Sequence, residues 1–358
     1  MKKFQSIWFI LFIFFSITAC RKAKSGGTTD DFDTLKQTVL ADFVDNVAIP
    51  QYQNFSAIAN TLNADVVALD ADATEVNLAK ARQSWKDLRT SWEQCEGFLF
   101  GPVEDDNYDP NMDTWPVDYN QLDSLLASSN PLAISDIQNL STLSLRGFHP
   151  IEYILWGVDG NRSAASITAR EKTYMISLTK DLQNNANSLN SSWITGAGNF
   201  GKEVKTAGSG STVYSKKQEV YLAITEAMIG ICDEVGGGKM AEPFDALDSN
   251  IVESPFSNNS TIDFKNNIIG LGNVYNGTFS GTGKGITNLV AAKNVSLDNK
   301  IKQQISAAVS SFNAITLSYE EAIFDQRTQI TSVRTTLETL KTTLEEALKP
   351  FIVQYITD

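Results

Sequence analysis

The sequence predicts an all-α protein made of two helical-bundle halves. Apolar residues recur at steps of three and four along most of the chain, and no segment alternates convincingly as a strand would. A stretch rich in glycine and serine, residues 196–211, separates two folded segments of similar length. We therefore expect a first bundle over residues 32–195, a linker over 196–211 and a second bundle over 212–358.

The N-terminus has the pattern of an export signal with a lipidation site. Lys2 and Lys3 precede an apolar run too short to span a membrane, and small residues stand just before Cys20. We expect residues 1–19 to be removed and residues 20–31 to form a flexible tether, with a lipid on Cys20 holding the protein in the cell envelope. Arg21 after the cysteine favours the outer membrane. An ordinary secretory signal with an incidental cysteine is the alternative.

Composition and charge narrow the possible partners. The chain has 358 residues, of which 42% are hydrophobic, so it can bury a large core. Its formal net charge is −13, and loss of Lys2 and Lys3 with the signal leaves −15. Such a surface repels nucleic acid, which excludes it as a partner, and suits a protein that handles cations.

Individual helices follow from apolar stripes with helical spacing. The clearest stripes are Leu78, Ala81, Trp85, Leu88, Trp92, Cys95 and Leu99, and Ile330, Val333, Leu337, Leu340, Leu344 and Leu348. Further helices fit residues 32–48, 51–62, 167–189, 214–235 and 299–324. Cys95 and Cys232 both fall within helical patterns, which favours two buried thiols; a disulfide between them is the alternative.

Glycine-flanked segments occur in both halves, at residues 147–152 and 270–275. A duplication would relate the two halves, and Gly272 and Tyr275 would then stand where His149 and Glu152 stand. Only the first copy would have kept the polar pair.

His149 is the only histidine of the chain, and Glu152 follows it three residues later. Side chains three apart on a helix share a face, so the two could bind one ion. Pro150 favours a helix that starts at this point, where the helix dipole stabilises the ionised form of Glu152. A helix-end hydrogen bond is the alternative for such a pair.

The segment from Arg146 to Gly157, with its Gly147-x-His149-x-x-Glu152 motif, resembles the signature segment of the imelysin family. Further segments resemble conserved segments of the same family, in the same order: residues 92–103, 109–118, 233–243, 253–257 and 273–277. The resemblance extends from Phe32 to Phe351. It implies an all-α fold of two bundle halves, an envelope location, a connection to iron uptake and a metallopeptidase label.

The expected ligand is a metal ion. The candidate ligands are His149, Glu152, Glu93, Glu96 and Asp113. Glu93 and Glu96 could instead form a solvated helix face, but the resemblance covers both and favours function. So many carboxylates suit iron, with calcium or zinc as alternatives, whereas haem with His149 as axial ligand has no other support. The alternating acids of residues 105–113 lack the pattern of an EF-hand and are expected to form an acidic rim.

The ligand set favours a binding protein over an enzyme. Zinc peptidases usually combine several histidines with a carboxylate base, whereas this chain offers one histidine and no separate base. We expect a lipoprotein that holds iron for an uptake system and its partner proteins. A metallopeptidase in which the same ion activates water is the alternative, and a purely structural role for His149 and Glu152 is the third possibility.

Overall fold

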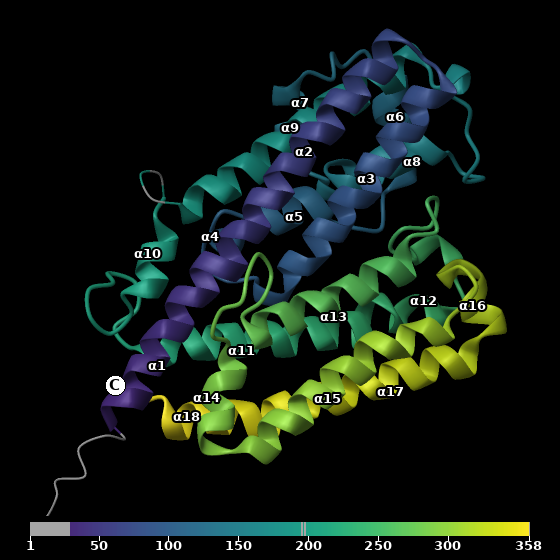
Figure 1. Cartoon of the computed structure of the whole chain (residues 1–358). Helices are drawn as coiled ribbons and strands as arrows, with labels where there is room; N and C mark the ends of the chain where they lie inside the picture. The colour runs from purple at the N-terminus through teal and green to yellow at the C-terminus, as the bar shows by residue number, and fades with distance from the viewer. Residues whose placement is uncertain (1–28, 195, 197, 358) are drawn as a thin grey trace, which may run out of the picture.

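The structure is a computed structural model that describes residues 29–194, 196 and 198–357. Within these residues the chain forms eighteen α-helices with short 3-10 and π-helical turns and no strand, which confirms the all-α prediction (Figure 1). No helix of this part is long and apolar enough to span a bilayer. The expected export signal, Cys20 and most of the tether lie outside the described residues.

The helices of the N-terminal part are α1 (Thr29–Asp42), α2 (Ile49–Ala71), α3 (Glu75–Cys95), α4 (Pro102–Asp105), α5 (Tyr108–Asp113), α6 (Tyr119–Ala127), α7 (Ile134–Gln138), α8 (Phe148–Trp156), α9 (Ala169–Trp193) and α10 (Phe200–Lys205). Those of the C-terminal part are α11 (Lys217–Asp233), α12 (Ala241–Ala246), α13 (Ser260–Asn276), α14 (Ile286–Lys293), α15 (Val295–Ser311), α16 (Tyr319–Asp325), α17 (Arg327–Thr343) and α18 (Lys349–Tyr355).

The helix boundaries depart from the sequence expectation in several places, and the expected helix 51–62 continues to Ala71. The first two expected helices are continuous, because the π-helical turn η1 (Phe43–Ala48) joins α1 to α2 and Pro50 lies in the first turn of α2, where proline is tolerated. The expected helix 299–324 is broken after Ser311, and Ser318 caps a new helix by accepting a hydrogen bond from the Glu321 backbone N–H. The expected linker contains the short helix α10, so the domain boundary stays a prediction.

The two halves meet where α13 packs against the C-terminal end of α3 and the 3-10 turn η2 (Glu96–Phe98) (Figure 1). A Cβ added to Gly97 would lie 2.7 Å from the Gly270 carbonyl carbon, and one added to Gly270 would lie 2.3 Å from the Gln94 carbonyl oxygen. Only glycine permits this approach of two backbones. It brings the acids at the end of α3 against the side chains of α13.

The first half is closed at one end by an aromatic cluster around Trp193. The Trp193 ring packs on five neighbours at centroid distances of 4.9 to 6.4 Å: Phe43, Tyr52, Phe98, Phe100 and Phe200. Such edge and tilted contacts add to the stabilisation from apolar burial. Nearby Cys95 is buried and unpaired, as is Cys232, which confirms two buried thiols without a disulfide.

Candidate metal centre

Arg89 lies at the centre of a buried polar region between the halves. Its side chain is 0% exposed and forms ion pairs with Glu93, Asp113, Glu253 and Asp263. The Nη2 atom lies 3.0 Å from Glu253 Oε1, and Nε lies 3.7 Å from Asp263 Oδ1. Two of these acids come from α3 and α5 and two from the second half, so one guanidinium group joins both halves.

Lys239 is the second buried cation of this region. It ends the π-helical turn η5 (Glu234–Lys239) and is 3% exposed. Its Nζ atom lies 2.8 Å from Glu253 Oε1, 3.1 Å from Glu96 Oε2, 3.4 Å from Glu234 Oε1 and 3.7 Å from Glu93 Oε2. The ammonium group is therefore shared among four carboxylates.

Six buried acids surround these two cations, and we call them the carboxylate cluster: Glu93, Glu96, Asp113, Glu152, Glu253 and Asp263. Asn267 on α13 supports the cluster by donating hydrogen bonds from Nδ2 to the carboxylates of Glu93 and Glu96. Two fixed cations cannot neutralise six ionised acids. Protons or a further cation must therefore balance the remaining charge.

Gly147 explains how His149 reaches the cluster. Gly147 has a φ of +73°, and a Cβ at this position would lie 1.8 Å from the Met112 carbonyl oxygen. Glycine therefore allows α8 to begin directly against the end of α5. As a result, His149 Nε2 lies 3.0 Å from Asp113 Oδ1, and its other ring nitrogen, Nδ1, has no hydrogen-bond partner among the described residues.

Glu152, one turn further along α8, is 0% exposed and holds a loop of the second half. Its Oε1 atom accepts hydrogen bonds from the Ser257 backbone N–H at 2.8 Å, the Ser257 hydroxyl at 2.6 Å and the Phe256 backbone N–H at 3.2 Å. Its Oε2 atom has no partner among the described residues.

A small cavity, which we call the histidine cavity, has His149, Glu152 and Glu253 among its lining residues. Its volume of about 10 Å³ suffices for one water molecule or one ion. Each of the three residues carries one buried atom without a partner in the described part of the chain: His149 Nδ1, Glu152 Oε2 and Glu253 Oε2. Unpaired buried polar atoms are costly, which makes a bound ligand the natural explanation.

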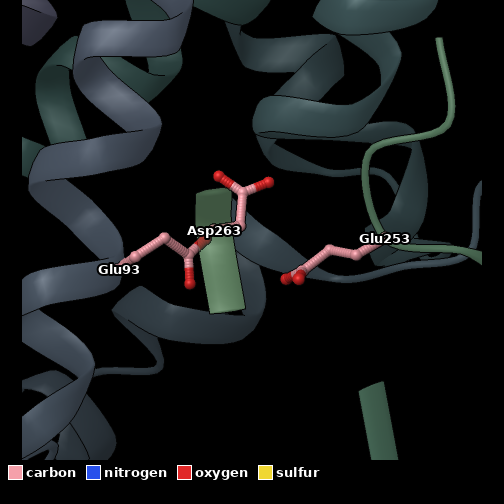
Figure 2. A group of neighbouring side chains, drawn as sticks. All are labelled: Glu93, Glu253 and Asp263. Carbon is pink, nitrogen blue, oxygen red and sulfur yellow. The ribbon is translucent and has the colours of Figure 1, made fainter. Parts of the chain in front are cut away.

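Two further groups of three acids have ligand atoms within 4.8 Å of one another in the described chain. The first is Glu93, Glu253 and Asp263, which come from three separate segments (Figure 2). Arg89 pairs with all three of these acids, so its guanidinium group already supplies their counter-charge. We therefore assign this group to Arg89 and not to a metal ion. The second group is Glu96, Asp109 and Asp113.

The second group adjoins a larger cavity of about 420 Å³, which we call the acidic pocket. Five acids line it, and no lysine, arginine or histidine does: Glu96, Glu104, Asp109, Glu226 and Glu234. The side chains of Glu226 and Glu234 are about half exposed, at 50% and 48%, so the pocket reaches solvent. A cation could enter the carboxylate cluster from this side.

Burial dominates the acid–base behaviour of the cluster. It raises the pKa of Glu96, Glu253 and Asp263, because the nearby cations offset only part of the desolvation. In the acidic pocket, burial and the negative charge of Asp113 raise the pKa of Asp109 from 3.8 to about 7. Asp113 is the exception. Although burial would raise its pKa, Arg89 and the hydrogen bond from His149 lower it below the ordinary range.

Glu152 corrects one expectation from the sequence. The helix dipole was expected to favour its ionised form, but burial raises the pKa of Glu152 and outweighs the hydrogen bonds from Ser257. The first-turn position is confirmed, since α8 begins at Phe148 and His149 is its second residue.

The five predicted ligands all lie in this buried region, but they form separate contacts. His149 contacts Asp113, while Glu152 binds the Ser257 loop and shares only the histidine cavity with His149. Glu93 contacts Arg89, and Glu96 contacts Lys239. Neither group of three acids described above includes His149 or Glu152. Their assignment as metal ligands stays a prediction.

Four important residues were not predicted as site residues: Arg89, Lys239, Glu253 and Asp263. Arg89 carried a usable signal, because it lies four residues after Trp85 on the buried face of α3 and four before Glu93. A charge within an apolar stripe requires buried partners. The other three belong to the second half, and nothing in the local sequence indicates which residues of the first half they meet.

The alternating acids of residues 105–113 do not form one loop. They divide between α4 and α5, and only Asp109 and Asp113 reach Glu96. Asp118, which ends the segment 109–118, caps α6 by accepting a hydrogen bond from the Gln121 backbone N–H at 3.0 Å. A haem on His149 would need far more room than the histidine cavity offers.

Comparisons with known proteins agree on one family. A family model described as Imelysin matches residues 48–350. Iron-regulated protein A of Synechococcus elongatus is 30% identical over 237 residues, which cover 66% of this chain and 63% of that protein. The chain thus spans under two thirds of the length of this curated relative.

Two solved structures share the fold. An iron-regulated protein A precursor from Parabacteroides distasonis has a TM-score of 0.81 and 26% identity, with 93% of this chain and 97% of that chain covered. An imelysin-like protein from Psychrobacter arcticum has a TM-score of 0.72 and 12% identity, with 89% and 96% covered. The second likeness concerns the fold alone.

Proposed function

Since the chain belongs to the imelysin family, we propose that it is a cell-envelope lipoprotein that binds one metal ion, preferably iron, for uptake. The ion would be held at the histidine cavity by His149 and Glu152 of the Gly147 motif, with Glu253 as a third ligand. One observation carries this proposal: each of these residues has a buried, unpartnered ligand atom and lines the same ion-sized cavity.

The donor set supports iron as the ion. One imidazole nitrogen and several carboxylate oxygens form a mainly hard set of ligands. Such a set suits iron and manganese, whereas thiolate ligands select softer metal ions. Two of the similar proteins are named for iron regulation. The surrounding acids add negative charge that favours a cation, and the acidic pocket places further carboxylates between solvent and the carboxylate cluster.

Binding fits the site better than peptide cleavage does. His149 and Glu152 are 2% and 0% exposed, and a cavity of about 10 Å³ cannot hold a peptide. Cavities that bind small organic ligands are usually ~300 Å³ or more. The same lack of space disfavours haem. Calcium and zinc are the other ions to be compared with iron.

The envelope location rests on the N-terminal pattern alone. A lipid on Cys20 would place the anchor nine residues before α1, which begins at Thr29. Mass spectrometry of the protein isolated from membranes should find an acylated Cys20 as the first residue. A protein that begins at another residue, without a lipid, would contradict the anchor but not the metal site.

The metal site is tested with Glu152→Gln. The substitution keeps the shape of the side chain but removes the negative charge, so we expect Fe²⁺ affinity to fall tenfold or more, measured by titration calorimetry without oxygen. Asp298→Asn is the matched control. Asp298 is also a buried acid (2% exposed), but it is bonded to Tyr275 and Thr287 away from the cavity.

Equal Fe²⁺ affinities in wild type and Glu152→Gln would refute the site, as would the absence of binding to wild type. Peptide cleavage that stops with a chelator and in Glu152→Gln would establish the metallopeptidase instead. A lower melting temperature of His149→Ala without any change in metal binding would leave only the structural role.

A further inference from the structure

Arg89 and Lys239 are both buried cations, but their surroundings differ. Arg89 lies in the middle of the long helix α3, and its guanidinium group packs 4.9 Å from the Phe148 ring. None of its four acidic partners lines the acidic pocket. Arg89 therefore has no acidic partner at the acidic pocket.

Lys239 stands between two cavities. Two of its partners, Glu96 and Glu234, line the acidic pocket, and a third, Glu253, lines the histidine cavity. A cation moving from solvent toward His149 would therefore meet carboxylates that the Lys239 ammonium group already occupies. Glu234, whose side chain is 48% exposed, offers the ammonium group a partner nearer to solvent.

The backbone before Lys239 is easy to deform. Three glycines, Gly236, Gly237 and Gly238, precede it in η5. None has a positive φ, and a Cβ added at Gly237 or Gly238 would make no contact shorter than 3.4 Å. Neither strain nor close packing requires glycine at these two positions, although each costs the helix about 0.5–1 kcal/mol. Mobility of the following lysine would account for them.

We propose that Lys239 is a built-in counter-cation that limits metal affinity, and that an incoming metal ion displaces its ammonium group from Glu96 and Glu253. This inference rests on the proposed metal-binding function. A metal ion would bind the Glu253 carboxylate at about 2.0–2.2 Å, whereas the ammonium group, which also contacts Glu96, lies 2.8 Å from Glu253 Oε1. The more compact and more highly charged metal ion should therefore replace the ammonium group, which moves toward Glu234.

The first test compares Lys239→Met with wild type, as full-length protein in detergent, by calorimetric titration with Fe²⁺ without oxygen and with Zn²⁺. Removal of the competing charge should tighten binding at least tenfold. Lys239→Arg keeps the charge and should not tighten binding. Lys341→Met is the matched control, because Lys341 pairs with Asp233 on the surface at 2.7 Å and should leave affinity unchanged.

The second test uses wild type only, so it does not depend on folding of a variant. Acetic anhydride labelling with mass spectrometry should find Lys239 protected without metal and at least fivefold more reactive when Fe²⁺ saturates the protein. Unchanged or weaker binding by Lys239→Met, or protection of Lys239 in the saturated protein, would refute the displacement alone. If neither wild type nor Lys239→Met binds either metal, the proposed function fails together with this inference.

Discussion

The aromatic cluster around Trp193 and the carboxylate cluster around Arg89 fill the interior in opposite ways. Trp193 packs on five aromatic rings, a stable arrangement that needs no ligand. Arg89 and Lys239 lie among six buried acids, an arrangement that well-packed apolar residues could replace without loss of stability. We therefore connect the carboxylate cluster with the proposed binding function and the aromatic cluster with folding.

The largest effect should come from breaking each cluster at its centre. Arg89→Met leaves buried acids unpaired and should lower the free energy of unfolding by about 3–5 kcal/mol at pH 7.5. Trp193→Ala opens a cavity and should cost a similar ~3–5 kcal/mol. The loss in Arg89→Met should shrink at pH 5.5, where the acids can take up protons, whereas the loss in Trp193→Ala should not change. Urea unfolding at both pH values measures the loss of unfolding free energy in each variant. If the two losses change equally with pH, the two clusters do not differ in the way described.

The two regions should also differ in how pH affects them. Asp109 has a pKa raised to about 7 in the folded protein against an ordinary 3.8, so it keeps a proton on folding that the unfolded chain releases. Its contribution to the stability of the metal-free protein therefore falls as the pH rises from about 4 to 7. A metal ion bound close to the carboxylate cluster favours the ionised form of Asp109 and so releases part of this proton, which means that metal affinity should weaken as the pH falls below 7, by at most about tenfold per pH unit.

Asp109→Asn should flatten this pH dependence of metal affinity, as followed by titration between pH 5.5 and 8. Trp193→Ala, whose neighbours do not titrate in this range, should retain the wild-type slope. If the slope in Asp109→Asn equals that of wild type, the proton comes from another acid.

The smallest effect concerns the glycines of η5. Gly238→Ala should stabilise the metal-free protein by about 0.5–1 kcal/mol, because the added methyl group meets no atom within 4 Å and alanine favours the helix. It should also slow Fe²⁺ binding in stopped-flow measurements, since Lys239 moves less readily. Faster or unchanged binding would show that the glycines do not assist the displacement of Lys239.

Helix periodicity predicted the long amphipathic helices well but missed α13. This helix carries Asn266, Asn267, Gly270 and Gly272, which are poor helix formers and interrupt its apolar face. Gly270 is required by the contact with α3, and Asn267 supports the carboxylate cluster. Gly270 and Asn267 therefore weaken the helical pattern in the sequence and at the same time help to form the candidate site.

The motif and its resemblance pointed to the half of the candidate site that lies in the first part of the chain. His149, Glu152 and Asp113 come from the first half, where resemblance and spacing identified them, and the structure places them together with Glu93 and Glu96 in one buried region. Glu253 and Lys239 lie far away in the sequence. The packing of α13 against α3 and η2 joins the halves, Lys239 then reaches Glu96, and Glu253 lines the histidine cavity; no local pattern contains that information.

The metal site can be located in crystals soaked in Fe²⁺ without oxygen, with anomalous diffraction recorded at the iron edge. We predict one strong peak in the histidine cavity, about 2 Å from a ring nitrogen of His149 and a carboxylate oxygen of Glu152. No peak between the halves, or iron only on surface acids while His149 keeps its contact with Asp113, would contradict this prediction.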